Sequence, residues 1–557
     1  MKKNRIVFIF LNITVLIFSC TAEESSLNEK FKVLANELYE KRTTEKLPGA
    51  YMLAMKSNAV LHQQGFGYAD FEHQVPVTDQ TVFDLASIAK MFTGYAIAEL
   101  AEQGLIDMDA EVQKYLPQFP VYDHKITVAH LVHHTSGVKN WTEFLSLAGW
   151  SFHDSISFDQ ITRLIYAQKS LDFIPGTQFK YSNSGYNLLV KIIENVSGLS
   201  FVEWTEKNIF VPLKMDSTFF NDQQNRIIPH LASGYYIDNN RVQRRAFNNL
   251  TAVGSSSLFS NAGDIQKWMT FLLHPPKNKQ RVIKRMFSTR KLSNGESNDY
   301  AYGINVRQYR ETAFIGHSGS WASNTSYLVV LPEQDAGIFI VHNFSTYTQN
   351  KIEAFTDLLL PEKEQIEEDT VQQPSLISLN NNELDQFVGT YKLGVAWYVT
   401  ISRKGNQLYT QANGEPAFIM DPISKDTFIV PAYRNRTIKF LKNTQGEVDA
   451  FSYINERRPK LDESRKLNPR ALTEFEGTYY NIELGALFEL KANDEGLFAH
   501  NHKHGVLELN TEEGDEFYGT GILRRIVFSR DQNKKIKGFY ISNSRGKKQW
   551  LFSLANP

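Results

Sequence analysis

A serine and a lysine three residues apart form the first pair in the chain that could do nucleophilic chemistry. Ser87 and Lys90 open a stretch whose apolar residues recur every three or four positions, which predicts a helix that ends at Gly104. Residues three apart share a helical face, so the amine of Lys90 can reach the hydroxyl of Ser87. A serine becomes a good nucleophile when a base takes its proton, and burial makes a lysine such a base by lowering its pKa. The pair therefore makes Ser87 a candidate nucleophile and Lys90 a candidate base for it.

A serine–lysine pair of this kind also arises by chance, so its weight depends on partner motifs further along the chain. Tyr181 and Asn183 lie in a polar stretch that precedes a predicted helix over residues 187–196. Loop residues that open a helix often carry chemistry, and helix capping is the alternative role for the same polar residues. His317 and Gly319 follow among strand-like runs, where a glycine lets the backbone pass close to a ligand.

Taken together, the three motifs resemble those of one hydrolase family. They occur in the order Ser87-x-x-Lys90, Tyr181-x-Asn183, His317-x-Gly319. The chain resembles the serine β-lactamase and penicillin-binding-protein-like family, on the class C side that uses a tyrosine, over about residues 28–355. Its His-Ser-Gly replaces the Lys-Thr-Gly of β-lactamases proper and resembles the D-aminopeptidase and esterase-type branch. The implied fold is an α/β (α+β) domain with a central antiparallel sheet flanked by helices.

The resemblance implies acyl-enzyme chemistry at three side chains. Ser87 would attack a carbonyl carbon and form an acyl-enzyme. Lys90 and Tyr181 would share the proton taken from Ser87 and later activate water. Which of the two is the base stays open at this point, because they can titrate as a coupled pair. The scheme needs no metal or organic cofactor.

The resemblance also implies a set of residues that bind substrate. Asn183 would orient Lys90 and contact a substrate amide, and His317 would contact a carboxylate or another polar group of the substrate. Gly319 would let strand and substrate approach closely. The backbone amides of Ser87 and Ser320 would form the oxyanion hole, worth on the order of 3 kcal/mol per donor.

Elements predicted from periodicity would hold these motifs. Apolar residues at helical spacing predict helices over residues 30–42 and 158–166, and short apolar runs predict strands over 50–54, 326–331 and 337–341. The last two runs are separated by a short turn, so we expect them to pair as antiparallel neighbours in one sheet.

Two groups of histidines raise the question of a metal site. His130, His133 and His134 share a helical face, but apolar neighbours favour a packed helix over a zinc site. His500, His502 and His504 alternate as they would on one strand face, where a solvated polar surface is the favoured interpretation. We therefore expect no metal in either place.

The first 20 residues have the composition of a targeting segment. A basic start precedes an apolar run over residues 6–18, which is too short to span a bilayer and typical of a signal sequence. Cys20, the single cysteine, follows this run and resembles the lipidated residue of bacterial lipoproteins; a plain secretory signal is the alternative. The sequence thus predicts a signal peptide over 1–20 and a lipid-anchored protein of the bacterial cell envelope, facing the periplasm or the outer membrane.

The last third of the chain has a different pattern. We expect the hydrolase domain over residues 28–360 and a polar linker over 361–379. Strand patterns follow, and Phe387 and Tyr391 reappear 88 residues later as Phe475 and Tyr479. This duplication predicts two antiparallel β domains, over 380–460 and 466–557, and a single barrel built from both copies is the alternative. These domains resemble the lipocalin-like appendages of some D-aminopeptidase-like proteins. We expect them either to cap the active site or to act as stabilising modules.

The expected function is that of a serine hydrolase acting on an amide or an ester. Candidate substrates are D-amino-acid-containing peptides, other small peptides and esters; β-lactam hydrolysis is less favoured because Lys-Thr-Gly is missing. The alternative is a non-catalytic lipoprotein that binds or senses β-lactams or cell-wall fragments. The formal net charge of -1 gives no argument for a nucleic-acid partner.

Overall fold

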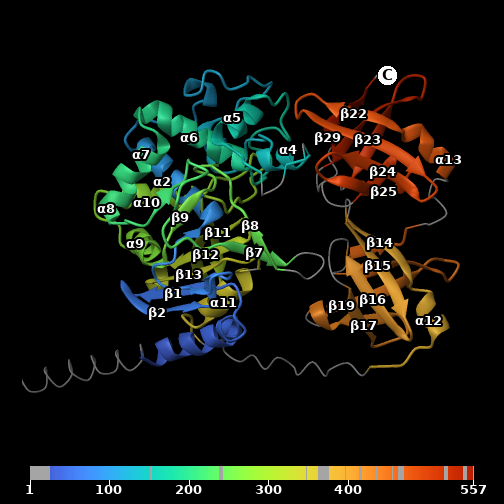
Figure 1. Ribbon diagram of the computed structural model, residues 1–557, viewed down its shortest axis with the longest axis horizontal. Helices are drawn as coiled ribbons and strands as arrows, with labels where there is room; N and C mark the ends of the chain where they lie inside the picture. The colour runs from blue at the N-terminus through green and yellow to red at the C-terminus, as the bar shows by residue number, and fades with distance from the viewer. Residues whose placement is uncertain are drawn as a thin grey trace, which may run out of the picture. The chain divides into compact units, whose positions relative to one another are not determined.

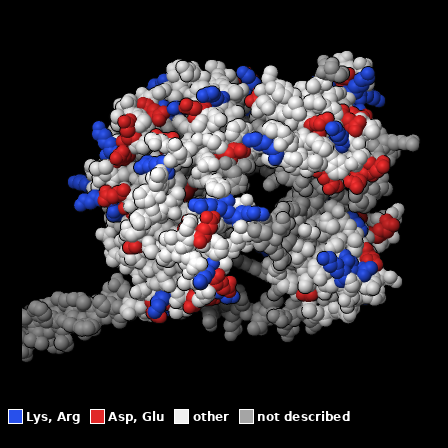
Figure 2. Space-filling model, viewed as in Figure 1, with Lys and Arg blue, Asp and Glu red and all other residues white. Residues whose placement is uncertain are grey.

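The computed structural model shows a chain of two compact units, one of residues 1–143 with 151–363 and one of residues 144–150 with 364–557 (Figure 1). The residues that the structure describes are 25–147, 149–150, 154–237, 243–346, 348–361, 376–394, 397–412, 417–433, 436–453, 456–461, 469–519, 523, 525–542 and 548–555. The predicted signal peptide, Cys20 and most of the predicted linker lie outside them. Among the helices of the described residues, none is long and apolar enough to cross a membrane. On the face that Figure 2 shows, acidic and basic side chains are intermixed.

The first unit is built on a six-stranded antiparallel sheet. Its strand order is β10-β11-β12-β13-β1-β2, so the first strand of the chain pairs with the last strand of the unit, and β2 pairs with β1 at the edge. The strands are β1 (Ala50–Lys56), β2 (Ala59–Phe66), β10 (Asn305–Tyr309), β11 (Thr312–Trp321), β12 (Asn324–Leu331) and β13 (Ala336–His342). The expected antiparallel pairing of the runs at 326–331 and 337–341 is confirmed, with Leu328 opposite Phe339.

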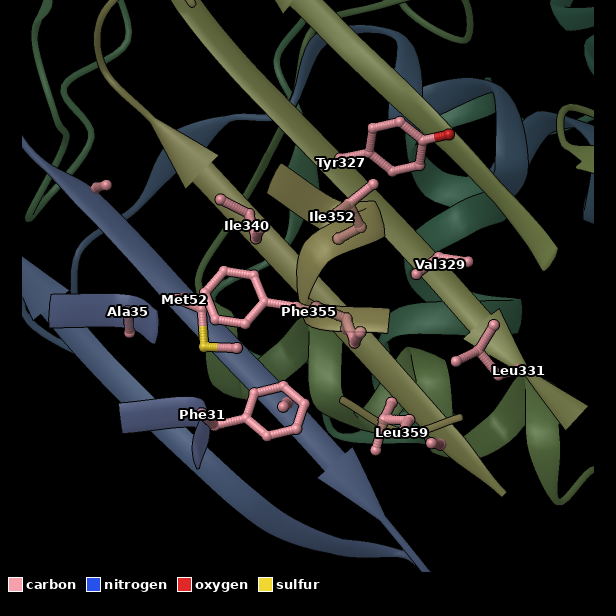
Figure 3. Close-up of a cluster of buried hydrophobic side chains, with 14 of the residues drawn as sticks. Phe31, Ala35, Met52, Tyr327, Val329, Leu331, Ile340, Ile352, Phe355 and Leu359 are labelled. Atoms are coloured by element: carbon pink, nitrogen blue, oxygen red, sulfur yellow. The ribbon is translucent and has the colours of Figure 1, made fainter. Parts of the chain in front are cut away.

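Both faces of the central strands are buried, which explains their almost continuous apolar sequence. In β1, Met52 belongs to a core cluster with Phe31 of the helix over residues 25–44 and Phe355 of α11 (Gln349–Asp357) (Figure 3). Met55 lies on the opposite face of β1 from Met52. Its sulfur accepts a hydrogen bond from the hydroxyl of Thr270 on α9 (Ala262–Leu273). The sheet is therefore covered by helices on both faces, as expected.

The helical part of the first unit, to which α9 also belongs, follows β5 (Phe83–Asp84) and precedes β10 in the sequence. Its helices are α2 (Ala89–Glu102), α3 (Val128–Val132), α4 (Trp141–Leu147), α5 (Phe158–Tyr166), α6 (Asn183–Ser197), α7 (Phe201–Thr205), α8 (Val211–Leu213) and α10 (Gln280–Met286). Short 3-10 segments are η1 (Ala86–Ile88), η2 (Val112–Lys114) and η4 (Pro332–Gln334), and η3 (Glu206–Phe210) is π-helical. Short strands pair as β3 (Tyr68–Asp70) with β4 (Val75–Pro76), β7 (Gly234–Ile237) with β8 (Gln243–Ala246), and β5 (Phe83–Asp84) and β6 (Phe219–Phe220) with β9 (Leu258–Ser260).

The second unit contains two separate eight-stranded sheets, so the single-barrel alternative is wrong. The first has the strands β14 (Gly389–Gly394), β15 (Trp397–Lys404), β16 (Gln407–Ala412), β17 (Phe418–Pro422), β18 (Thr427–Val430), β19 (Arg436–Lys442), β20 (Val448–Tyr453) and β21 (Glu456–Pro459). The second is a closed barrel of β22 (Gly477–Asn481), β23 (Ala486–Asn493), β24 (Gly496–Asn501), β25 (Gly505–Glu513), β26 (Glu516–Gly519), β27 (Ile526–Arg530), β28 (Ile536–Ser542) and β29 (Lys548–Leu554). Short helical segments are α12 (Asn381–Asp385), η5 (Pro431–Tyr433), α13 (Pro469–Leu472) and η7 (Thr473–Phe475).

The two sheets repeat each other in detail. Tyr391 donates its hydroxyl to the carbonyl of Phe387 at 2.8 Å, and Tyr479 donates to Phe475 at 2.9 Å. The rings of Tyr391 and Phe451 lie 5.0 Å apart at 48°, and those 88 residues later lie 5.0 Å apart at 49°. The expectation of two C-terminal antiparallel β domains is confirmed.

Candidate active site

Ser87 lies in a tight turn that links β5 to α2. The residue before it, Ala86, has a φ of 49°, a left-handed conformation that costs a residue with a Cβ about 1–2 kcal/mol. The carboxylate of Asp84 accepts the Ala86 N–H at 2.8 Å, and Asn248 donates to the same carboxylate at 2.5 Å. These two bonds hold the turn in its strained shape, which presents Ser87 just ahead of the helix.

Strand β11 passes directly behind this turn. A Cβ placed on Gly319 would meet the carbonyl oxygen of Leu85 at 2.1 Å, so only glycine fits there. Ser326, which pairs with Gly319 across the strands, donates its hydroxyl to the same Leu85 oxygen at 2.9 Å. The structure thus brings the His317-x-Gly319 motif next to the turn that contains Ser87. Ser320, which is exposed, follows Gly319 along the strand.

Lys90 is fully buried and bonded to three oxygen atoms. Its Nζ lies 2.6 Å from the carbonyl oxygen of Ser255, 2.7 Å from Oδ1 of Asn183 and 3.1 Å from Oγ of Ser87. Two of the predicted partners, Ser87 and Asn183, therefore meet at this amine. Ser255 was not foreseen, because a main-chain carbonyl can belong to any residue type.

Burial lowers the pKa of Lys90 well below its ordinary value, since the charged form loses its hydration there. Among the described residues, no carboxylate lies within ion-pair distance of this amine. The oxygens of Ser255 and Asn183 can only accept, so they take the two hydrogens of a neutral amine. The remaining lone pair of Lys90 then faces the Ser87 hydroxyl, which is the arrangement that a general base requires.

Tyr181 completes this group of side chains. Its ring centroid lies 4.8 Å from the Lys90 amine, and its hydroxyl oxygen is buried with no hydrogen-bond partner among the described residues. Burial raises the pKa of Tyr181, and the hydroxyl of Ser87 opposes this rise in part. The phenol therefore keeps its proton at neutral pH and is available as a donor. It lies two residues before α6, which begins at Asn183 rather than at 187.

His317 is buried and engaged at both ring nitrogens. Its Nδ1 lies 2.5 Å from the carbonyl oxygen of Ser318, to which it donates, and its Nε2 accepts the hydroxyl of Tyr300 at 2.9 Å. Burial is the main cause that lowers the pKa of His317 to about 3. The His317 ring is therefore neutral at physiological pH. Tyr300 is a further residue of the site that no sequence motif predicted.

His134 packs against the rings of two site residues, Tyr181 and Tyr300. The ring centroids of His134 lie 4.4 Å from Tyr181 and 4.3 Å from Tyr300. The Ser182 N–H donates to Nδ1 of His134 at 3.2 Å, and burial lowers the pKa of this imidazole well below its ordinary value. The phrase His134-Thr-Ser-Gly in the sequence thus marks a packing element next to Tyr181.

The other histidines have separate structural partners. His130 accepts the Thr127 N–H at the start of α3, and His133 bonds the carbonyl of Tyr300 at 2.8 Å. The expectation that His500, His502 and His504 share a strand face is wrong, because β24 ends at Asn501 and residues 502–504 form the turn before β25. Within the described residues, one group of three side chains has its possible metal-ligand atoms close enough together to hold an ion. It consists of Asp70, Glu72 and His73 and is largely exposed.

Comparison with known proteins identifies the family. The Beta-lactamase family matches residues 35–360. Protein flp of Staphylococcus aureus (strain MRSA252) is 28% identical over 353 residues, which are 61% of this chain and 67% of that protein. Penicillin-binding protein 4* of Bacillus subtilis (strain 168) is 26% identical over 420 residues, 72% of this chain and 91% of that protein.

Solved structures show the same fold. The octameric penicillin-binding protein homologue from Pyrococcus abyssi superimposes with a TM-score of 0.55 at 24% identity, covering 77% of this chain and all of that one. A D-amino acid amidase from Ochrobactrum anthropi SV3 superimposes with a TM-score of 0.50 at 20% identity, over 60% of this chain and 97% of that one. The family match and the geometry around Ser87 together support serine-hydrolase chemistry through an acyl-enzyme. The chain belongs to the beta-lactamase family.

Proposed function

We propose that this protein is a serine hydrolase that cleaves an uncharged amide or ester of a D-amino acid. The observation that carries the proposal is the buried amine of Lys90, which lies 2.6 Å from the carbonyl oxygen of Ser255, 2.7 Å from Oδ1 of Asn183 and 3.1 Å from Oγ of Ser87. A neutral amine that gives its two hydrogens to the first two oxygens turns its lone pair toward the Ser87 hydroxyl. That geometry supports Lys90 as the base in acylation, the role that the sequence left open between Lys90 and Tyr181.

In the proposed reaction, Oγ of Ser87 attacks the substrate carbonyl carbon while its proton passes to Lys90. The backbone amides of Ser87 and Ser320 are assigned to the developing oxyanion. Collapse of the tetrahedral intermediate breaks the bond to the leaving amine or alcohol, which takes a proton from the phenol of Tyr181. Lys90 returns its proton to Tyr181, and a water molecule then releases the acyl group by the same steps in reverse.

The substrate class follows from the neutrality of His317. In this chain, histidine stands where lactamases proper carry the lysine of Lys-Thr-Gly, and both of its nitrogens are occupied by Tyr300 and Ser318. A substrate carboxylate at that place would find no free cationic donor on His317, so the site favours an uncharged amide or ester there. The similarity of fold to a D-amino acid amidase supports a D-configured acyl part.

The test is a comparison of matched substrates on the full chain. D- and L-phenylalanine amide, the corresponding methyl esters, a D-alanyl dipeptide with a free carboxylate and a cephalosporin are incubated with the protein and with Ser87→Ala. We expect turnover of the uncharged D-compounds, at least tenfold faster than of the L-compounds and of the charged dipeptide. Preference for the charged dipeptide would contradict the assignment of His317, and a stable cephalosporin adduct without turnover would favour a sensor.

We also propose that the protein is a lipid-anchored protein of the cell envelope. The support is the sequence alone, with its basic start, its apolar run and Cys20. Expression in a bacterium with radioactive palmitate should label the wild-type chain and leave Cys20→Ala unlabelled. Equal labelling of both chains, or secretion of the wild type without label, would contradict the anchor.

A further inference from the structure

The first of the two C-terminal sheets contains a cavity in its apolar interior. The cavity measures about 220 Å³ and is lined by Leu393, Trp397, Val399, Thr410, Ala412, Ile438, Phe451 and Tyr453. Trp397 is 49% exposed, so the cavity reaches the surface at that residue. All of these residues belong to β14–β16, β19 and β20 of one sheet.

The strand registers identify the equivalent positions in the second copy. Val399 lies opposite Tyr391 in the first sheet, and Phe488 lies opposite Tyr479 in the second. Since the two tyrosines are equivalent, a phenylalanine in the barrel occupies the position of a valine that lines the cavity.

A second aromatic ring of the barrel is also missing from the first copy. Arg458 lies opposite Phe451, whereas Phe552 lies opposite the equivalent Phe539. Phe552 packs at 5.0 Å on Phe539 and at 5.4 Å on Phe488, so the two extra rings fill the interior of the barrel. The cavity is therefore a specific difference between two copies that otherwise share their aromatic core.

One polar group inside the cavity lacks a partner. Thr410 is 1% exposed, and its hydroxyl has no hydrogen-bond partner among the described residues. The equivalent residue of the barrel is Ala499, because Thr410 pairs with Ile401 as Ala499 pairs with Leu490. A buried hydroxyl without a partner costs free energy, and a ligand that bonds to it removes this cost.

We propose that the first β domain binds a small, mainly apolar molecule with one hydrogen-bonding group, held by the aromatic walls and by the hydroxyl of Thr410. At about 30 Å³ per non-hydrogen atom, the share of a water molecule in the liquid, the cavity holds about seven such atoms. A medium-chain alkyl alcohol has this size and chemistry. An uncharged head fits better than a carboxylate, because none of the residues that line the cavity is charged. The nearby cation, Arg458, pairs with Glu456 and leaves only its buried Nε without a partner among the described residues. This site is separate from the Ser87 chemistry.

The test uses 1-hexanol as the probe and the full chain. Isothermal titration calorimetry should show saturable binding to the wild type. Val399→Phe, which introduces the ring that the barrel has, should abolish it. Thr410→Ala should weaken it about threefold to tenfold, the value of one hydrogen bond. Hexanoate should bind more weakly than hexanol.

A control variant separates filling of the cavity from a general effect of an added ring. Ile419→Phe changes an exposed residue of the same sheet and should leave hexanol binding unchanged. Absence of saturable binding to the wild type would overturn the proposal. Unchanged affinity in both Val399→Phe and Thr410→Ala would also overturn it, because the alcohol would then bind elsewhere. Tighter binding of hexanoate would overturn the uncharged class.

Discussion

At the scale of single residues, the proposed chemistry depends on a neutral amine at Lys90. Because burial lowers the pKa of Lys90, kcat/KM for an uncharged substrate should rise with pH as this amine loses its proton and should level off well below pH 10. Lys90→Arg should lose about 10²- to 10⁴-fold in kcat/KM at every pH, since a guanidinium stays protonated. The measurement is a pH–rate profile of both proteins.

An observed profile that rises only near the ordinary pKa of lysine would contradict a neutral Lys90. So would a Lys90→Arg variant with substantial activity. His130, which is partly buried and far along the chain from these contacts, provides a control: His130→Gln should leave the midpoint of the profile in place.

Tyr181 makes a second, separate prediction. Its phenol keeps its proton and has no other hydrogen-bond partner among the described residues, so it is available to the leaving group. Tyr181→Phe should lower kcat about 10²- to 10⁴-fold with KM changed little, because the phenylalanine keeps the ring contacts with His134. Steady-state kinetics on an amide substrate provides the measurement. A variant whose kcat equals that of the wild type would show that another group donates the proton.

The sequence revealed much of this site because its side chains occur in short motifs with characteristic spacing. Ser87, Lys90 and Asn183 meet within hydrogen-bond distance as the motifs predict. Two contacts could not be found in this way. The Ser255 acceptor is a main-chain carbonyl, and Tyr300 reaches His317 from an irregular segment before β10 that has no sequence pattern of its own.

At the scale of the secondary-structure elements, the turn between β5 and α2 depends on the buried carboxyl of Asp84. Burial raises the pKa of Asp84 to about 7, against 3.8 as its ordinary value. Between these pH values the unfolded chain has lost a proton that the folded chain keeps, so the free energy of unfolding falls as pH rises. The loss is about 4 kcal/mol by pH 8, at 1.36 kcal/mol per unit.

Asp84→Asn should remove this pH dependence, because an amide cannot titrate but can still accept the Ala86 N–H. Urea denaturation at pH 4, 6 and 8 measures the effect. The free energy of unfolding of the wild type should fall more steeply with pH than that of the variant. Parallel curves would show that the carboxyl does not titrate as described.

Helix boundaries illustrate what periodicity reveals and what it misses. The helix over 158–166 was predicted as it stands, because capping at Ser157 and an apolar stripe agree. The predicted start of α6 is four residues late, since its first turn contains polar residues that break the apolar pattern: Asn183, which accepts from Lys90, and Ser184, which bonds the main chain of Lys139 and Trp141. The strand expected at His502 failed because an alternating pattern of three residues is also compatible with a turn.

At the scale of the whole molecule, the duplication predicts equal energetics at equivalent positions. Tyr391 and Tyr479 make the same hydroxyl bond to a carbonyl four residues earlier. Tyr391→Phe and Tyr479→Phe should therefore each destabilise their own domain by about 1–3 kcal/mol, the cost of a buried carbonyl left unpaired. Differential scanning calorimetry should show one transition lowered in each variant, and a different transition in each case. Loss at one site only would contradict the equivalence of the two copies.

The 88-residue offset was visible in the sequence because the aromatic core is shared, as at Phe440 and Phe528. The cavity was not, because it depends on which strand positions face inward. The change from Phe488 to Val399 becomes meaningful only when the registers of both sheets are known.

The central claim is that Ser87 carries the acyl group, and intact-protein mass spectrometry tests it most directly. The full chain is mixed with a slowly hydrolysed D-amino acid ester and quenched in acid, beside the Ser87→Ala and Lys90→Arg variants. We predict a mass increase of one acyl group that maps to the peptide containing Ser87, is absent from Ser87→Ala and forms far more slowly in Lys90→Arg. An acyl group on Ser87→Ala to the same extent, or turnover by that variant, would contradict the account.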